Sequence, residues 1–329
     1  MIARTAPAIG FAFAVAALPA CGGDADPPAV GPSAFKVALL LAGPENDEGW
    51  NQSAFEGLGQ IERELGAEVR KISAGDATAI DQAFAAAAAN GFDLAIGHGF
   101  EFNAPAARAA AAHPEVDFVT SGGLSSAANL ASVSLRIGEA TWQLGILAAH
   151  LTQSGVVSSL HGEAYEPVKQ AAAAFTAGAR SVKPTIVVLE EYLGSWEDSV
   201  LAKEKALAHA AQGADVFFQN ADAAGAGIFE ACRAKGALAF GCNRDQSGKA
   251  PDVIVASAVG EPGKLLVELA KEARAGSFRG GVRTFGLAEG DLRIAFNPAL
   301  AARVPAAARA AMDAAAAAIV RGELKIDAR

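Results

Sequence analysis

The residues best suited to chemistry lie between positions 44 and 57, where the sequence reads PENDEGWNQSAFEG. Three acidic residues precede Trp50, and the amide side chains of Asn51 and Gln52 follow it directly. An indole offers a flat apolar face, and the neighbouring amides and carboxylates can donate or accept hydrogen bonds. This combination suits the binding of a small planar ligand. A capped helix start with a packing tryptophan is the alternative interpretation.

Signatures of catalysis are missing from the rest of the sequence. The five histidines form neither a two-histidine helical pair nor a cysteine–histidine ligand set; they are His98, His113, His150, His161 and His209. There is no Gly-x-Ser-x-Gly elbow and no phosphate-binding Gly-Lys-Ser/Thr loop. Residues 223–229 offer two glycines of a dinucleotide fingerprint, but Glu230 occupies the third glycine position. We therefore expect a protein that is not an enzyme and holds no metal or other cofactor.

The elements that must position the 44–57 segment read as alternating strands and helices. The first series predicts strands at 35–42, 67–72, 93–98 and 116–121, with helices at 51–65, 78–90 and 103–113 between them. A further strand is expected at 130–137. These strands are nearly continuous apolar runs, which is typical of a parallel sheet covered on both faces.

A second series follows and repeats the pattern. Its predicted strands are 155–160, 185–190, 215–219 and 237–242, and its helices are 139–152, 168–181, 197–212 and 225–235. The remaining elements are strands at 252–258, 282–287 and 292–296 and helices at 262–275 and 305–321. Two successive βα series in a chain of 329 residues predict two doubly wound α/β lobes, with the last third added to both.

Polar and aromatic residues follow the carboxyl ends of these strands, where open α/β sheets bind ligands. They include Phe102 and Asn103 in the first series, and Trp196 and Asp222 in the second. Trp50 and Trp196 thus stand in loops of different series. If the lobes face one another, the two indoles could sandwich a planar ligand. The alternative for each is a packing role at a helix start.

The N-terminal residues indicate export and anchoring. Arg4 is the only charged residue among the first 20, and positions 9–17 form a short apolar core typical of a signal peptide. Small residues then precede Cys21, as in lipoprotein processing sites. We expect a signal peptide over 1–20, lipidation of Cys21, and a lipid-anchored linker over 21–34. A plain secretory signal with an unrelated cysteine is the alternative.

The body of the chain sets broader limits. The net charge of −9 and pI near 5.1 of the whole chain, without a cluster of lysine and arginine, argue against nucleic acid as a partner. No apolar run in the body reaches the roughly 20 residues that span a bilayer. We expect Cys232 and Cys242 to be small buried residues, and a disulfide between them is the alternative.

Several motifs occur in a fixed order: Asp47–Gly57, Tyr192–Asp198, Gly241–Gln246 and Phe285–Leu287. Together they resemble the basic membrane protein family, the lipid-anchored substrate-binding proteins of ABC transporters. The resemblance implies a type I periplasmic-binding-protein fold, with two Rossmann-like lobes of parallel sheets joined by three crossing strands. It implies that lobe I covers 35–136 plus 255–287, and lobe II covers 137–254 plus 288–329.

The resemblance also assigns roles to single residues. Trp50 and Trp196 would stack on a heterocyclic base, and Asn51 and Asn103 would bond its edge. Gly225 or Gly227 would offer a backbone N–H. Asn243 and Asp245 lie in the segment that holds the ribose in nucleoside binders. The candidate ligand-binding residues are Asp47, Trp50, Asn51, Phe102, Asn103, Trp196, Asp222, Gly225, Asn243 and Asp245.

The sequence departs from the family pattern around the expected sugar. Asn243 stands where the family has an acid, and the family's lysine is missing from the stretch 256–260. Ser121 replaces an aspartate at the end of another strand. Because unmatched buried polar groups are costly, a free purine base or another flat heterocycle is as good a candidate as a nucleoside.

We therefore expect an extracytoplasmic solute-binding lipoprotein. It would deliver a small purine-like ligand to the permease of an ABC importer by closing a cleft between its lobes. We expect a monomer attached to the cell envelope through its lipid anchor, on the periplasmic or extracellular face of the membrane. A ligand-sensing periplasmic protein that signals to a membrane receptor is the alternative.

Overall fold

The structure is a computed structural model that describes residues 34–326 together with Met1. The predicted signal peptide, Cys21 and nearly all of the predicted linker lie outside the described residues. Every strand and helix expected from the sequence between 35 and 321 is present, with its ends shifted by no more than one or two residues. The alternation of apolar runs and helical periodicity therefore predicted the elements correctly.

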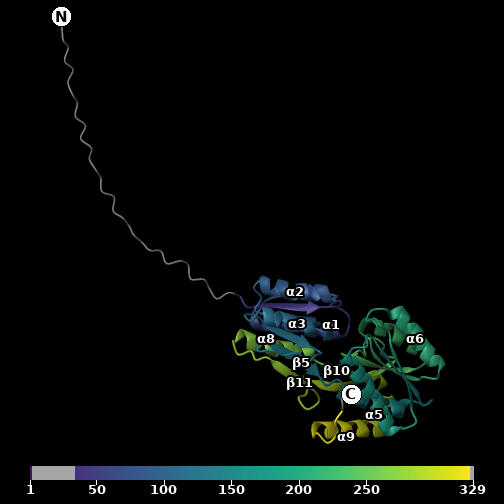
Figure 1. Cartoon of the computed structure of the whole chain (residues 1–329). Coiled ribbons are helices and arrows are strands. Elements are labelled where there is room, and N and C mark those ends of the chain that lie inside the picture. Colours follow the sequence, from purple (N-terminus) through teal and green to yellow (C-terminus); the bar gives the residue numbers. More distant parts are fainter. Residues whose placement is uncertain (2–33, 327–329) are drawn as a thin grey trace. The chain divides into compact units, whose positions relative to one another are not determined.

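The first sheet has the strand order β11-β5-β4-β3-β1-β2, and all its strands are parallel. These strands are β1 (Lys36–Leu41), β2 (Glu68–Ser73), β3 (Leu94–His98), β4 (Asp117–Ser121), β5 (Leu130–Leu135) and β11 (Gly281–Phe285). One face packs against α1 (Trp50–Leu65) and α8 (Pro262–Arg274). The other face packs against α2 (Ala77–Ala89) and α3 (Asn103–Ala112). We call this unit the first lobe (Figure 1).

The second sheet has the order β12-β10-β9-β8-β6-β7, in which β12 is antiparallel to β10. Its strands are β6 (Val156–His161), β7 (Val187–Tyr192), β8 (Val216–Asn220), β9 (Leu238–Asn243), β10 (Ile254–Gly260) and β12 (Leu292–Phe296). Helices α4 (Gly138–Leu151), α5 (Glu166–Val182) and α9 (Ala306–Val320) cover one face. Helices α6 (Ser199–Ala211) and α7 (Gly225–Lys235) cover the other. We call this unit the second lobe.

Residues of the central strands alternate between two apolar cores. In β1, Ala38 and Leu40 join the core under α2 and α3, whereas Val37 and Leu39 join the core under α1 and α8. All four side chains are fully buried. Burial on both faces explains why this strand reads as a continuous apolar run, and it fixes the edge at which the strand ends.

The expected boundary at residue 255 is wrong. Strand β10 is parallel to β9 and antiparallel to β12, so it belongs to the second lobe and the chain returns to the first lobe after Gly260. The reason is that β10 continues the βα series of the second sheet. The chain passes between the lobes three times, at 136–137, at Glu261 and at 286–291.

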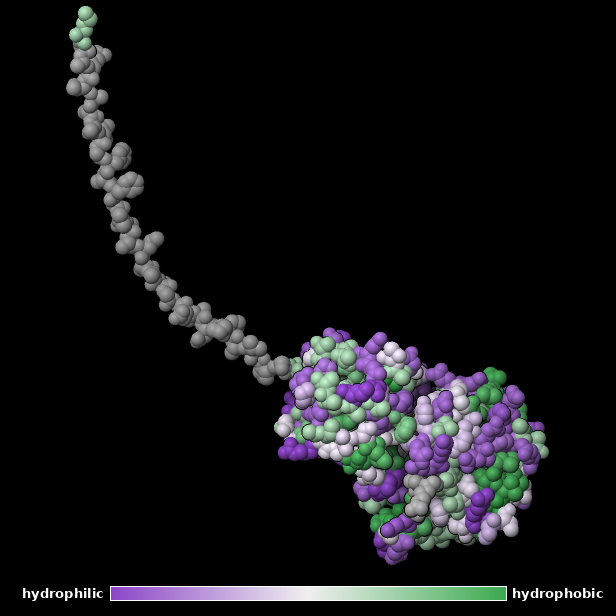
Figure 2. All heavy atoms as spheres, in the orientation of Figure 1, coloured by the Kyte–Doolittle hydropathy of each residue, from purple (hydrophilic) through white to green (hydrophobic). Residues whose placement is uncertain are grey.

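Other features of the described residues concern the two remaining cysteines and the surface. Cys232 and Cys242 are buried and free. Among the described helices, none has the length and apolar character needed to cross a membrane. On the face of the body drawn in Figure 2, hydrophilic and hydrophobic residues are interspersed.

Candidate functional site

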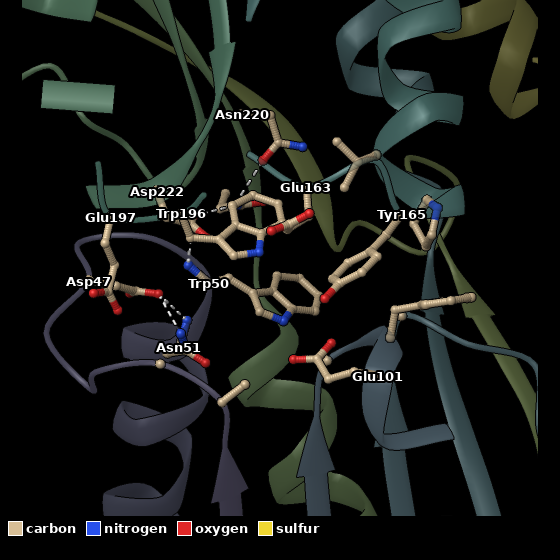
Figure 3. Close-up of a pocket in the computed structure, with 18 of the residues that line it drawn as sticks. Asp47, Trp50, Asn51, Glu101, Glu163, Tyr165, Trp196, Glu197, Asn220 and Asp222 are labelled. Carbon is tan, nitrogen blue, oxygen red and sulfur yellow. Dashed lines mark hydrogen bonds between the residues drawn. The ribbon is translucent and has the colours of Figure 1, made fainter. Parts of the chain in front are cut away.

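A cavity of about 530 Å³ lies where loops of both lobes meet. Its wall is built from the loops that follow β1, β2 and β3 in the first lobe and β6, β7 and β8 in the second. These are carboxyl ends of parallel strands, the edge at which open α/β sheets bind ligands. Figure 3 shows Trp50 and Trp196 among the side chains that line it.

Trp50 rests on a histidine that the sequence analysis did not place in the site. Its indole stacks on the imidazole of His98, with ring centroids 4.4 Å apart and 21° between the planes. Burial lowers the pKa of His98 to about 3, so the ring is neutral. Its Nε2 donates to the backbone carbonyl of Trp50 at 3.0 Å, and its Nδ1 accepts from the hydroxyl of Ser121 at 2.8 Å. Trp50 is therefore held by both its ring and its backbone.

Asp47 organises the loop that carries Trp50. Its Oδ2 accepts hydrogen bonds from the backbone N–H and from Nδ2 of Asn51, each at 2.8 Å. Its Oδ1 accepts from the backbone N–H groups of Gly49, at 2.9 Å, and Gln52, at 3.0 Å. A carboxylate at the start of α1 is stabilised by the helix dipole as well as by these bonds. Asp47 thus orients Asn51, which itself lines the cavity.

The second lobe contributes two aromatic side chains. Trp196 lies against the backbone of Gly162, where an added Cβ would come within 2.2 Å of the indole. Tyr165 is tilted at 46° to Trp196, with centroids 6.3 Å apart. Tyr165 also stacks on Phe100 of the first lobe, with centroids 5.7 Å apart and 29° between the planes. Four aromatic rings from both lobes therefore line one cavity.

The wall of the cavity is strongly acidic. In the described part of the chain it includes six carboxylates and neither lysine nor arginine. The carboxylates belong to Asp47, Asp76, Glu101, Glu163, Glu197 and Asp222. Burial raises the pKa of Glu101, which lies on the short helix η1 (Phe100–Phe102).

Asp222 joins the two lobes at one side of the cavity. Its Oδ1 accepts a hydrogen bond from the backbone N–H of Trp50 at 3.3 Å and another from Nδ2 of Asn243 at 2.9 Å. A Cβ at Gly49 would lie 2.1 Å from the same oxygen, so only glycine permits this approach. Burial, and then repulsion by Asp47, raise the pKa of Asp222 to about 7.

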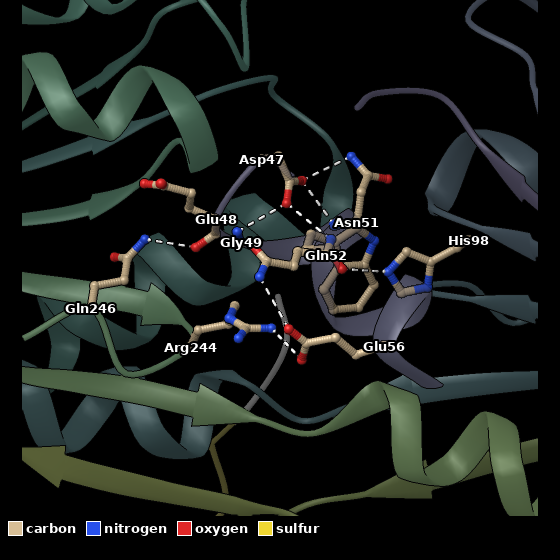
Figure 4. Close-up of polar contacts among 10 residues, drawn as sticks. Asp47, Glu48, Gly49, Asn51, Gln52, Glu56, His98, Arg244 and Gln246 are labelled. Atoms are coloured by element: carbon tan, nitrogen blue, oxygen red, sulfur yellow. Dashed lines mark hydrogen bonds and ion pairs between the residues drawn. The ribbon is translucent and has the colours of Figure 1, made fainter. Parts of the chain in front are cut away.

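Further contacts extend this junction (Figure 4). Nε2 of Gln246 donates to the backbone carbonyl of Glu48 at 3.3 Å, and the Glu48 carboxylate pairs with Lys249. Arg244 of the second lobe pairs with Glu56 of α1 at 2.8 Å. We call the contacts made by Asp222, Arg244, Gln246 and Lys249 with the first lobe the interlobe latch.

Backbone strain is concentrated in this latch. Within the described residues, the non-glycine positions with positive φ are Glu48 (60°), Asp222 (45°) and Asn243 (66°). Asp222 is itself a latch residue, the backbone carbonyl of Glu48 accepts from Gln246, and Asn243 donates to Asp222. Strained backbone persists where the surrounding contacts determine it, and it is common at ligand clamps.

Six of the ten predicted site residues line the cavity: Asp47, Trp50, Asn51, Trp196, Asp222 and Asn243. Four do not. Phe102 is fully buried in the core beside Phe84, and Asn103 bonds the backbone of Phe100 and the hydroxyl of Thr120.

The other two, Gly225 and Asp245, make contacts within their own segments of the chain. Gly225 starts α7 against the side chain of Gln219, and Asp245 accepts hydrogen bonds from the backbone N–H and hydroxyl of Ser247. The expected ligand contacts of Phe102, Asn103, Gly225 and Asp245 are thus not found in this cavity, because their side chains or backbones are used locally.

Six residues that shape the cavity were not among the ten predicted: His98, Phe100, Glu101, Glu163, Tyr165 and Glu197. Glu163 and Tyr165 follow β6, a predicted strand whose loop could have been examined like the others. His98 ends β3 inside an apolar run, where nothing in the pattern indicates that it stacks on Trp50.

Known proteins resemble this chain in both sequence and fold. The family model described as "ABC transporter substrate-binding protein PnrA-like" matches residues 34–313. The chain is 25% identical over 319 residues to the ABC transporter nucleoside-binding protein BmpA of Lactococcus lactis, covering 90% of each. It is 25% identical over 264 residues to a purine-binding protein of Brucella abortus, covering 79% of this chain and 75% of that protein.

A solute-binding protein of an ABC transporter system from Aeropyrum pernix has the same fold. Its structure superimposes with a TM-score of 0.82 at 21% identity, covering 89% of this chain and 92% of the other. Members of the matched family bind a small molecule outside the cytoplasm for a membrane permease and are binding proteins rather than catalysts. The chain belongs to the PnrA-like family of ABC transporter substrate-binding proteins.

Proposed function

We propose that this protein captures a purine base or nucleoside in the cavity between its lobes and delivers it to an ABC importer. The observation that carries the proposal is the set of aromatic rings that both lobes direct to one cavity: Trp50, Phe100, Tyr165 and Trp196. Stacking between indoles is a general way to hold a heterocyclic base. A cavity of about 530 Å³ also falls in the size range of small-molecule sites.

The names of two relatives support a purine-like ligand. One is called a nucleoside-binding protein and the other a purine-binding protein, and each aligns with most of this chain. Asn51 would bond the edge of the base, since Asp47 already fixes its carboxamide beside Trp50. The rings would then supply most of the affinity, and Asn51 would supply orientation.

The sugar subsite of nucleoside binders has no clear counterpart in this chain. Asn243 is engaged by Asp222, and Asp245 bonds Ser247. The stretch 256–260 lies in β10 and contains no lysine. We therefore propose that the ligand is either a free purine base or a purine nucleoside.

Closure of the cleft would couple binding to delivery. The interlobe latch and the Phe100–Tyr165 stack form only when the lobes approach, so a ligand that contacts both lobes favours the closed state. The permease would recognise that state. No covalent step is required of any residue in the cavity.

We also propose that Cys21 carries the lipid anchor and that the mature chain is monomeric. The proposed anchor rests on the sequence before Cys21. In cells expressing the full chain, Cys21→Ser should move the protein from the membrane fraction to the soluble fraction of the envelope. Membrane retention of this variant would contradict a lipid anchor at Cys21.

The ligand can be identified by thermal shift. The chain from Gly22 onward, which contains both lobes whole, would be tested against purine bases, nucleosides, sugars and amino acids. A ligand at 100 times its Kd adds about 2.7 kcal/mol to stability, which is readily measured. A shift with bases or nucleosides is expected. If only sugars or amino acids raise the melting temperature, the proposed function is wrong.

A further inference from the structure

The six carboxylates of the cavity wall divide into two groups. Three are committed to the protein itself: Asp47 and Asp76 cap backbone N–H groups, and Asp222 forms part of the latch. The other three are Glu101, Glu163 and Glu197. Within residues 34–326, no lysine, arginine or histidine pairs with these three carboxylates, and no other residue donates a hydrogen bond to them. Glu101 accepts a hydrogen bond only from its own backbone N–H. The cavity therefore contains negative charge that the folded chain leaves uncompensated.

Glu101 and Glu163 approach the aromatic rings from opposite lobes. Burial, then the charge of Glu101 and then that of Glu163 raise the pKa of Tyr165. Figure 3 shows the two carboxylates directed toward the aromatic side chains.

The position of Glu101 depends on a glycine. Gly99 has a φ of 145°, a conformation that favours glycine, and a Cβ there would lie 2.6 Å from Oε2 of Glu101. The carboxylate thus folds back over the bare backbone of Gly99. This placement keeps Glu101 at the cavity wall, where its charge faces any ligand that enters.

We propose that the cavity selects a planar heteroaromatic cation, with its ring between Trp50 and Trp196 and its positive charge between Glu101 and Glu163. This inference rests on the proposed function, because it assumes that a flat ring binds between the indoles. It specifies that the ligand is positively charged, whereas the proposed function does not specify the ligand's charge.

Two physical arguments favour a cation over a neutral ligand of the same shape. A neutral ring can donate hydrogen bonds to a carboxylate, but it also removes water from the glutamates while leaving their charge in place, which is costly. A cation compensates that charge as it displaces the water. The faces of tryptophan and tyrosine also attract cations, most strongly when water is excluded.

The test compares ligand pairs that differ by one methyl group and one charge. Adenosine would be paired with 1-methyladenosine, which is protonated at neutral pH, and nicotinamide with 1-methylnicotinamide, which is permanently cationic. Titration calorimetry of the chain from Gly22 onward would measure the four affinities. Where a pair binds, we expect the affinity of the cation to exceed that of its neutral partner by about tenfold or more.

Three variants locate the source of this preference. Glu101→Gln and Glu163→Gln should each reduce this preference several-fold, measured as the ratio of the cation's affinity to that of its neutral partner. Glu62→Gln is the matched control, because Glu62 is an exposed residue of α1 outside the cavity. It removes one negative charge from the first lobe and should preserve the preference.

The outcomes separate this inference from the proposed function. If the neutral partners bind as tightly as the cations, or the preference survives both glutamine variants, the charge selection is wrong and the proposed function stands. If no flat compound binds, both are wrong. Because the wild-type comparison needs no variant, poor folding of Glu101→Gln would not prevent the test.

Discussion

Both lobes arrange five successive strands in the same order, β2-β1-β3-β4-β5 in the first and β7-β6-β8-β9-β10 in the second. By this order, the loop after β1 corresponds to the loop after β6. The first carries Trp50 and the second carries Tyr165, whereas Trp196 follows β7, the counterpart of β2. The two tryptophans therefore do not occupy equivalent positions, although they line the same cavity. Loops at equivalent positions in the two lobes therefore contribute different aromatic residues to the cavity.

The lobes also differ in how firmly they hold their aromatic residues. Trp50 is fixed by stacking on His98, by a backbone bond to the same histidine, and by a loop that Asp47 ties to α1. Trp196 is placed by contact with Gly162 and by the bond from the Ala224 N–H to its carbonyl. The first lobe thus presents a preorganised platform, and the second lobe closes a less constrained surface over it. Preorganisation raises affinity because less freedom is lost on binding.

The largest expected effect comes from removing that platform. Trp50→Ala deletes the stacking face and leaves the His98 ring without its partner. Stacking on an aromatic residue contributes about 1–3 kcal/mol per base, and a preorganised ring belongs at the upper end, so we expect affinity for the planar ligand to fall about 100-fold. Titration calorimetry against the ligand found in the thermal-shift panel measures it. A fall smaller than that of Trp196→Ala would reverse the ranking of the two lobes.

Trp196→Ala should cost less. Its ring belongs to the less constrained surface. The ring of Tyr165 lies beside it, with centroids 6.3 Å apart, and can keep part of the contact with the ligand after Trp196 is removed. We expect affinity to fall about tenfold, at the lower end of the stacking range. The same titration measures it, with the circular dichroism spectrum as a control for folding. Unchanged affinity would remove Trp196 from the ligand site.

The sequence predicted the elements, and six of the ten candidate residues line the cavity. The other four candidates lie elsewhere for physical reasons. Periodicity shows that Phe102 and Asn103 follow a strand, but not that Phe102 turns into the core while its neighbour Glu101 lines the cavity. Successive residues of a short helix point in different directions, and burial decides which one is exposed to the ligand. His98 is similar: its role depends on a stacking contact with a residue 48 positions earlier in the chain.

The boundary between lobes failed for a different reason. The apolar run of β10 is equally compatible with either sheet, and pairing with β9 and β12 is decided only by tertiary structure. The interlobe latch could not be predicted from the sequence either, because 172 residues separate Asp222 from Trp50 and 188 residues separate Arg244 from Glu56. Local patterns predict elements, whereas contacts between distant loops define this site.

Asp222 tests whether the latch is under electrostatic strain. Its pKa is raised from 3.8 to about 7 by burial and by Asp47, so the folded state binds a proton that the unfolded chain has released. The free energy that this proton contributes to folding is fully present below about pH 4, and it is lost as the pH rises from there to about 7. Asp222→Asn keeps an oxygen that can accept from the Trp50 N–H but carries no charge. Its melting temperature relative to wild type should therefore rise between about pH 4 and 7 and level off above that range.

Differential scanning calorimetry across this pH range measures the effect. Asp215→Asn is a less suitable control, because that carboxylate accepts bonds from Thr152 and Gln153. Asp313→Asn is better, since Asp313 is exposed on α9. A pH-independent difference between Asp222→Asn and wild type would show that Asp222 is ionised without penalty in the folded state.

The smallest expected effect separates contacts between lobes from contacts within one. Arg244–Glu56 joins the lobes at 2.8 Å, and Arg233–Asp252 lies within the second lobe at 2.7 Å; the side chains in both pairs are partly or largely exposed. Exposed ion pairs contribute about 0.2–1 kcal/mol, so Arg244→Gln should weaken ligand binding by no more than about fivefold. Arg233→Gln should leave binding unchanged, because its ion pair persists whether the cleft is open or closed. Equal effects of the two variants would mean that the latch does not take part in closure, and the affinity would then depend on the aromatic surfaces alone.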